Sequence, residues 1–168
     1  ASGTGKSTLA QQIAFHRARE GDRVLLITGL EEPHHNLLEH LSTYHFADNK
    51  LVGPQIETVS LVPFLDRSLS EKVDVLRKTV LNAKPHWVVM DGLRSFEAFL
   101  NDVQGTYQFL YSLTSWFALE NITLVLTKDT DPALVTDQPE FALMDTVVAL
   151  ARERVGRHAL RRLSVLKA

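Results

Sequence analysis

The sequence contains no cysteine and no long hydrophobic run, and each absence excludes a class of protein. Without cysteine, the chain has no disulfides and no thiolate metal sites. Apolar runs such as Trp87 to Met90 and Ile122 to Leu126 are much shorter than the roughly 20 residues that cross a bilayer. The printed sequence also shows no secretory signal. We therefore expect a cytoplasmic protein that does not enter the membrane.

An excess of charge of one sign is also lacking. The 18 Lys and Arg residues nearly balance the 20 Asp and Glu residues, which gives a net charge of -2. Bulk charge therefore supplies no attraction to nucleic acid or to an anionic membrane. Residues 152–167 are an exception, with six basic residues against one Glu, although such runs are usually solvated faces. A length of 168 residues with 45% hydrophobic residues indicates one globular domain over residues 1–168.

Short apolar segments alternate with longer segments of helical spacing. This alternation predicts a three-layer α/β/α domain with a mostly parallel sheet. The predicted helices begin near Lys6 and near Pro33 and cover Ser70 to Asn82 and Thr106 to Leu119. The predicted strands are Arg23 to Thr28, Ile56 to Leu61, His86 to Asp91 and Ile122 to Thr127.

The sequence also predicts details of the first helix and of the carboxyl-terminal segment. In the first helix, the predicted buried stripe is Leu9, Ala10, Ile13 and Ala14, and Gly21 is placed to end the helix. At the carboxyl end, Thr146 to Ala151 and Ala159 to Leu166 flank a short turn. We expect these two segments to form a β-hairpin on the edge of the sheet.

The chain opens with a glycine-rich stretch that runs into the first helix. It matches the P-loop pattern G-x-x-x-x-G-K-[ST] from the second position onward. The residues predicted to contact nucleotide are Ser2, Gly3, Thr4, Gly5, Lys6, Ser7 and Thr8. Backbone N–H groups and the helix N-terminus favour phosphate, while Lys6 can reach the β- and γ-phosphates and serve catalysis. The strand that precedes such a loop would lie before Ala1, so residues 1–168 alone are expected to bind nucleotide poorly.

Carboxylates follow two of the predicted strands. Asp91 ends an apolar strand and, across the sheet from a P-loop, is positioned to order the water shell of Mg²⁺, for which the Ser7 hydroxyl is a ligand. Glu31 and Glu32 follow another strand, where a carboxylate can orient or deprotonate the attacking water. These glutamates can equally be an acidic helix N-terminus, because Pro33 opens the next helix.

Four motifs occur in an order that resembles the RecA superfamily, and within it the KaiC-type ATPases. They are Gly3 to Thr8, Leu30-Glu31-Glu32, Val88 to Asp91 and Leu163 to Lys167. The resemblance implies a RecA-like P-loop NTPase fold that binds ATP with Mg²⁺ and hydrolyses it. It also implies that Glu31 and Glu32 are a catalytic pair and that Thr127 senses the γ-phosphate.

The same resemblance carries expectations about assembly. It implies a hexameric ring with nucleotide between subunits, in which Lys167 reaches the neighbour's γ-phosphate. Clock ATPases that phosphorylate themselves carry a Ser-Thr pair where this sequence has Phe141-Ala142. We therefore expect no phosphorylation of that kind between residues 130 and 146. The sequence leaves the identity of protein partners open.

Two other functions compete with a partner-directed ATPase. One is a DNA-dependent recombinase or helicase of the same superfamily, whose loops after two of the strands grip a single strand. The corresponding segments here, 96–104 and 129–140, carry acidic residues and no Lys or Arg, which disfavours nucleic acid there. The other is a module that binds nucleotide without hydrolysing it, which Glu31, Glu32 and Asp91 argue against.

Overall fold

A computed structural model describes residues 3–28, 39, 41–64, 66–93, 96–97, 103–130 and 138–168. The helices are α1 (Lys6–Arg19), α3 (Leu69–Ala83) and α5 (Val103–Leu119), with short 3₁₀ turns η1 (Asn49–Leu51), η2 (Val62–Phe64) and η4 (Pro139–Leu143). The strands are β1 (Val24–Thr28), β2 (Ile56–Ser60), β3 (Trp87–Asp91), β4 (Thr123–Leu126), β5 (Val147–Val155) and β6 (His158–Lys167). None of the helices in this described part of the chain is long and apolar enough to cross a membrane.

The central sheet has four strands in the order β2-β1-β3-β4, and every neighbouring pair is parallel. Its register pairs Thr28 with Asp91 and Met90 with Leu126. The carboxyl ends of all four strands therefore meet at one edge of the sheet. The predicted α/β architecture with a parallel sheet is confirmed.

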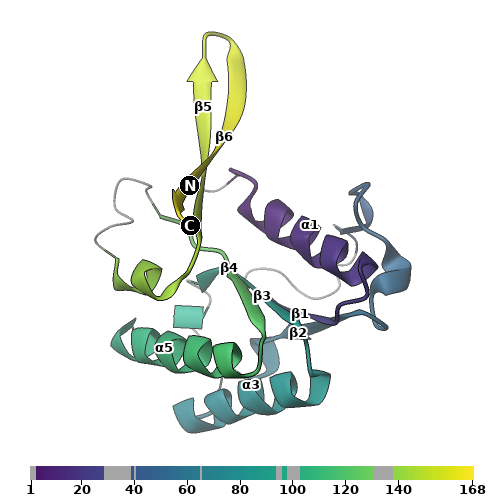
Figure 1. Ribbon diagram of the computed structural model, residues 1–168, viewed down its shortest axis with the longest axis vertical. Helices are drawn as coiled ribbons and strands as arrows, with labels where there is room; N and C mark the ends of the chain where they lie inside the picture. Colours follow the sequence, from purple (N-terminus) through teal and green to yellow (C-terminus); the bar gives the residue numbers. More distant parts are fainter. Residues whose placement is uncertain are drawn as a thin grey trace.

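Helices cover both faces of this sheet, and the side chains of β1 alternate between them. Leu25 and Ile27 pack with the apolar residues of α3 and α5, whereas Val24 and Leu26 pack with those of α1. Figure 1 shows the same arrangement, with α1 above the sheet and α3 and α5 below it. Because each face is covered, the strands are apolar on both sides, which is why they read as continuous hydrophobic runs.

Helix α3 has strong local signals at both ends. The Ser68 side chain accepts a hydrogen bond from the backbone of Glu71, and the Glu71 carboxylate accepts one from the backbone of Ser68. This reciprocal capping box satisfies two amide groups that the first turn leaves without partners. At the other end Lys84 adopts a left-handed conformation, φ 44°, just before Pro85. Both signals fix the helix to within a residue of its predicted limits.

Helix α1 begins at Lys6 as predicted, but its buried stripe differs. The buried residues are Ala10, Gln11, Ala14, Phe15 and Ala18. Leu9 and Ile13 are only half-buried, because the helix turns Phe15 and the small alanines toward β1 and β3. Phe15 is fully buried and lies 6.0 Å from the Phe46 ring, centroid to centroid. The predicted stripe was therefore wrong for Leu9 and Ile13.

The carboxyl-terminal hairpin forms, but not where it was expected. Strands β5 and β6 pair antiparallel with each other as a separate two-stranded sheet, so the prediction of a hairpin on the edge of the main sheet was wrong. A cavity lies between β4 and β5, and within the described residues β5 takes its strand pairing from β6 alone. Figure 1 shows the hairpin extending away from the layered body.

Candidate functional site

The glycine-rich loop turns directly into α1. Gly3 and Gly5 have φ of 79° and 97°, in the left-handed region that favours glycine, and Gly5 caps the helix. Thr4 between them is buried, with 3% of its surface exposed. A Cβ at Gly5 would lie 3.8 Å from the Arg161 guanidinium, so β6 covers this end of the loop. The Arg161 guanidinium therefore lies close to the N-terminal end of α1.

Three predicted site residues come together at the carboxyl edge of the sheet. The Ser7 hydroxyl donates to Asp91 Oδ1 at 3.0 Å, and the Thr127 hydroxyl donates to the same oxygen at 2.6 Å. Thr127 Oγ1 in turn accepts from the backbone N–H of Gly92 at 2.8 Å. The parallel register explains the meeting, since Asp91 and Thr127 each follow the paired residues Met90 and Leu126.

Lys6 lies beside this group and contacts oxygen atoms of its own chain. Its ammonium donates to Thr4 Oγ1 at 3.1 Å and forms an ion pair with Asp129 Oδ1 at 2.5 Å. The hydrogen bond from Lys6 holds the pKa of the Asp129 carboxyl below its ordinary value. Sequence reasoning identified Asp129 only as part of an acidic segment and missed this contact. The position of Asp129, two residues after Thr127 and just beyond the end of a predicted strand, was the signal in the sequence that could have predicted it.

Aromatic residues lie at the other end of the loop. The hydroxyls of Thr8 and Tyr44 are 3.4 Å apart, and the Tyr44 ring stacks on Phe46 with 4.9 Å between centroids. Tyr44 is partly exposed, as is Phe46. Sequence reasoning missed Tyr44 because it lies 36 positions from Thr8 in a segment without a recognised motif.

An ion-pair cluster flanks the site beyond Thr127. Lys128 pairs with Glu140 of η4 and lies 3.7 Å from Glu97 Oε1, and all three side chains are less than a quarter exposed. The Gln138 amide donates to Thr130 Oγ1 at 2.7 Å. These contacts tie the segment after β4 to η4 and to the segment after β3.

Comparison with known proteins places this arrangement in a family. A family model described as "ATPase: KaiC" matches residues 1–168. The chain belongs to the KaiC ATPase family. Among solved structures it is similar to a KaiC-like protein, PH0186, from Pyrococcus horikoshii OT3, at 19% identity and a TM-score of 0.76, covering 99% of this chain and 75% of that one. No curated protein matches.

Family membership confirms the predicted RecA-like P-loop fold and supports ATP binding by an ATPase domain. At the observed identity, the likeness to PH0186 establishes the fold alone. Three of the predicted site residues, Ser2, Glu31 and Glu32, lie outside the described residues. The helix expected to start near Pro33 also lies largely outside them, although Leu41 is helical and buried.

Lys167 contacts η4. It ends β6, and its ammonium donates to the carbonyl oxygen of Ala142 in η4 at 3.2 Å. Its side chain is exposed. A role toward a neighbouring subunit, which the family resemblance implies, stays a prediction.

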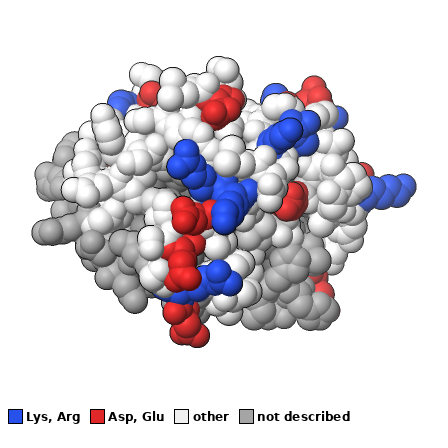
Figure 2. Space-filling view, turned by 90° about the horizontal axis from the view of Figure 1, so that it is seen from below, with Lys and Arg blue, Asp and Glu red and all other residues white. Residues whose placement is uncertain are grey.

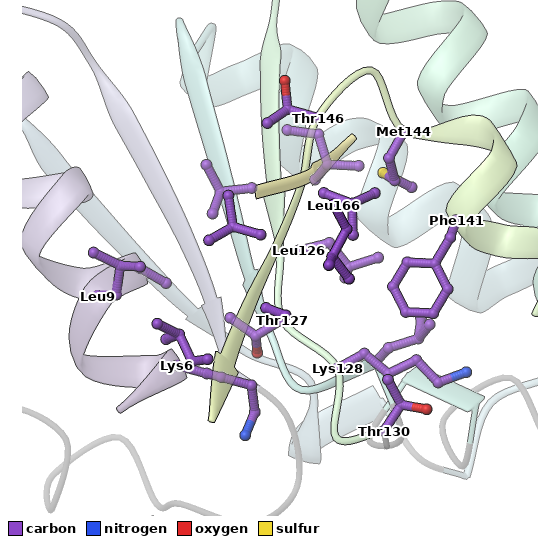
Figure 3. A pocket seen from close by; sticks show the side chains of 18 of the residues that line it. Lys6, Leu9, Leu126, Thr127, Lys128, Thr130, Phe141, Met144, Thr146 and Leu166 are labelled. Atoms are coloured by element: carbon purple, nitrogen blue, oxygen red, sulfur yellow. The ribbon is translucent and has the colours of Figure 1, made fainter. Parts of the chain in front are cut away.

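A cavity of about 360 Å³ opens beside the site, between α1, β4 and β5. Figure 3 shows Lys6 and Thr127 near one another at one end and Leu126, Phe141 and Leu166 along the walls. The apolar walls suit apolar groups, whereas Lys6, Thr127, Lys128 and Thr130 gather at one end of the cavity. The surface over Gly3 to Thr8, with its amides and Lys6, is the better match for phosphate.

Proposed function

We propose that this protein is a Mg²⁺-dependent ATPase that binds the triphosphate of ATP over residues 3–8 and hydrolyses its terminal phosphate. The observation that carries the proposal is the contact of Ser7 with Asp91 at 3.0 Å, beside the ammonium of Lys6. The oxygen atoms of Ser7 and Asp91 can bind a hard cation, and the ammonium of Lys6 can bind phosphate. Family membership supports ATP as the nucleotide.

The donor set around Asp91 fits magnesium. Ser7 Oγ and the Asp91 carboxylate are hard oxygen donors, which Mg²⁺ prefers, and Thr127 fixes the carboxylate from the other side. Bound Mg²⁺ would neutralise charge on the β- and γ-phosphates. The protein's own part is to hold Asp91 in one orientation before nucleotide arrives, so that little reorganisation is needed.

For the hydrolytic step we assign the water-activating role to Glu31 and Glu32, on the strength of their place after β1 and the family resemblance. Replacing both by Gln should lower turnover by about 10²- to 10⁴-fold, the range of general acid–base effects, while ATP still binds. Phosphate release and equilibrium binding measured on the same preparations separate the two quantities. Unchanged turnover in the double variant would exclude the assignment.

The nucleoside end of ATP is assigned to the surface around Tyr44. Thr8 is the last residue of the phosphate motif, and its hydroxyl lies 3.4 Å from that of Tyr44, which supports a place for the base beside this aromatic ring. Tyr44→Ala should weaken ATP binding and leave binding of inorganic tripolyphosphate unchanged, since only ATP carries a base to stack. Tyr111→Ala, on the exposed face of α5, is the control. Equal losses for both ligands would contradict the assignment.

We further propose that the chain assembles into a ring through the hairpin. β5 and β6 expose an unusual number of apolar side chains, at 43–59% of their surface, namely Val148, Leu160, Leu163, Val165 and Leu166. Leu163→Asp with Val165→Asp should reduce the mass in solution to that of one chain, whereas Tyr111→Asp should not. If the hairpin substitutions leave the mass of the assembly in solution unchanged, the hairpin is not this interface. Lys167, at the end of β6, would then lie next to the adjoining subunit.

A DNA-dependent ATPase is the second candidate, and the basic hairpin is the observation that favours it. Arg152, Arg154 and Arg157 cluster there, and Arg162 is paired with Glu153 at 2.8 Å. On the opposite face, which Figure 2 shows, Lys and Arg lie beside Asp and Glu instead of forming a patch of one sign. Salt-dependent binding of single-stranded DNA together with stimulated turnover would favour this function; turnover indifferent to DNA would favour protein partners.

A further inference from the structure

Lys6 is the charged group of the phosphate loop, and in this structure a carboxylate of the same chain meets it. Asp129 Oδ1 lies 2.5 Å from Lys6 Nζ, so the two groups form a close ion pair. A carboxylate and a phosphate both present anionic oxygens to an ammonium group. Asp129 therefore contacts the same donor that the proposed function assigns to ATP.

The backbone around Asp129 is anchored on both sides, so this contact is built into the fold. The Thr127 hydroxyl is hydrogen-bonded to the Asp91 carboxylate and to the backbone N–H of Gly92. Lys128 is paired with Glu140, and Thr130 accepts from Gln138. The residues on either side of Asp129 are thus held by other parts of the protein, while the Asp129 carboxylate contacts Lys6.

The exposure of the two side chains suits a displaceable contact. The Asp129 side chain is 47% exposed and that of Lys6 is 22% exposed. When a phosphate approaches, the Asp129 carboxylate can return to water at small cost, because it was never fully desolvated.

We propose that Asp129 is an autoinhibitory anion that holds Lys6 in the nucleotide-free protein and that ATP must displace. The inference rests on the proposed function, since it takes phosphate as the competing ligand. It assigns Asp129 a role in setting affinity, not in the hydrolytic step. Removing its charge strengthens phosphate binding, because the free state loses a stabilising ion pair that the bound state does not contain.

The test compares Asp129→Asn with Asp129→Glu and Asp74→Asn in binding of Mg-ATP and of tripolyphosphate by calorimetry on the full-length protein. Asp74 lies exposed on α3, so its substitution makes the same change in net charge away from the site. Asp129→Asn should bind both ligands about two- to fivefold more tightly, the range expected for a partly exposed ion pair. Asp129→Glu keeps the charge and should behave as the wild type, as should Asp74→Asn.

Each failure has its own signature. If the wild type binds Mg-ATP and Asp129→Asn binds it no more tightly than Asp74→Asn does, the autoinhibitory role is wrong and the proposed function stands. If Asp129→Asn binds more weakly, Asp129 assists the ligand instead of competing with it. If neither protein binds Mg-ATP or tripolyphosphate, the proposed function fails, and the autoinhibitory role fails with it.

Discussion

Substituting Thr127 tests whether the hydrogen bonds around Asp91 stabilise the fold. The Thr127 hydroxyl donates to the Asp91 carboxylate at 2.6 Å and accepts from the Gly92 amide at 2.8 Å. Thr127→Val has nearly the same shape and removes both bonds, while Thr127→Ser keeps the hydroxyl. The two variants therefore separate hydrogen bonding from packing.

The magnitude follows from the two bonds. A hydrogen bond to a charged group contributes about 1.5–3 kcal/mol and a neutral one about 0.5–1.5 kcal/mol. Thr127 is half-buried, so we take the low end of the sum, about 2 kcal/mol, which lowers Tm by about 4–8 °C in a domain of this size. Thr127→Ser loses one methyl group, at most about 0.8 kcal/mol.

Urea unfolding and thermal melts of the two variants, without nucleotide, provide the comparison. We expect Thr127→Val to be less stable than Thr127→Ser by more than about 1 kcal/mol, since only the valine removes the hydrogen bonds that Thr127 forms with the Gly92 amide and with the Asp91 carboxylate. Equal stabilities would refute the reasoning, because they would mean that the hydroxyl contributes nothing beyond what water supplies.

Three further outcomes follow from the packing and the charges. Phe15→Ala should lower the free energy of unfolding by about 3–5 kcal/mol, whereas Leu119→Ala, 83% exposed at the end of α5, should have little effect in the same denaturant titration. Ser68→Ala should cost about 1 kcal/mol through loss of the α3 N-cap, visible in the same titration. The pKa of the Asp129 carboxyl is lower in the folded protein than in the unfolded chain. The carboxylate therefore stabilises the fold above the unfolded pKa, and this stabilisation is lost as pH falls through the folded pKa. The Tm of the wild type should exceed that of Asp129→Asn at pH 7, and the two Tm values should converge in acid.

The strands and the meeting of Ser7 with Asp91 could be predicted from the sequence. A parallel strand covered on both faces reads as an unbroken apolar run, and parallel strands bring their carboxyl ends to one edge. Asp91 was therefore recognisable from its place at the end of β3, and Lys6 and Ser7 from the glycine-rich loop before α1. These residues depend on local pattern and on sheet geometry alone.

Other features depend on long-range packing that local pattern does not encode. In α1, the residues that begin at Leu9 and those that begin at Ala10 both have the spacing of a buried helix face. The structure buries the second set, which the sequence did not favour because it includes the polar Gln11. The hairpin has the same strand pattern whether or not it joins the main sheet. The Lys6–Asp129 and Thr8–Tyr44 contacts join positions far apart in the chain, through segments without regular periodicity.

The most direct test of the account is phosphate release from Mg-ATP by the full-length protein, comparing the wild type with Lys6→Met and with Lys50→Met, an exposed lysine of η1. The account predicts turnover by the wild type and Lys50→Met, and a loss of about 100-fold or more in Lys6→Met, since an electrostatic contact to the transferring phosphoryl group is removed. Turnover by Lys6→Met at the wild-type rate would contradict the assignment of the phosphate site to residues 3–8.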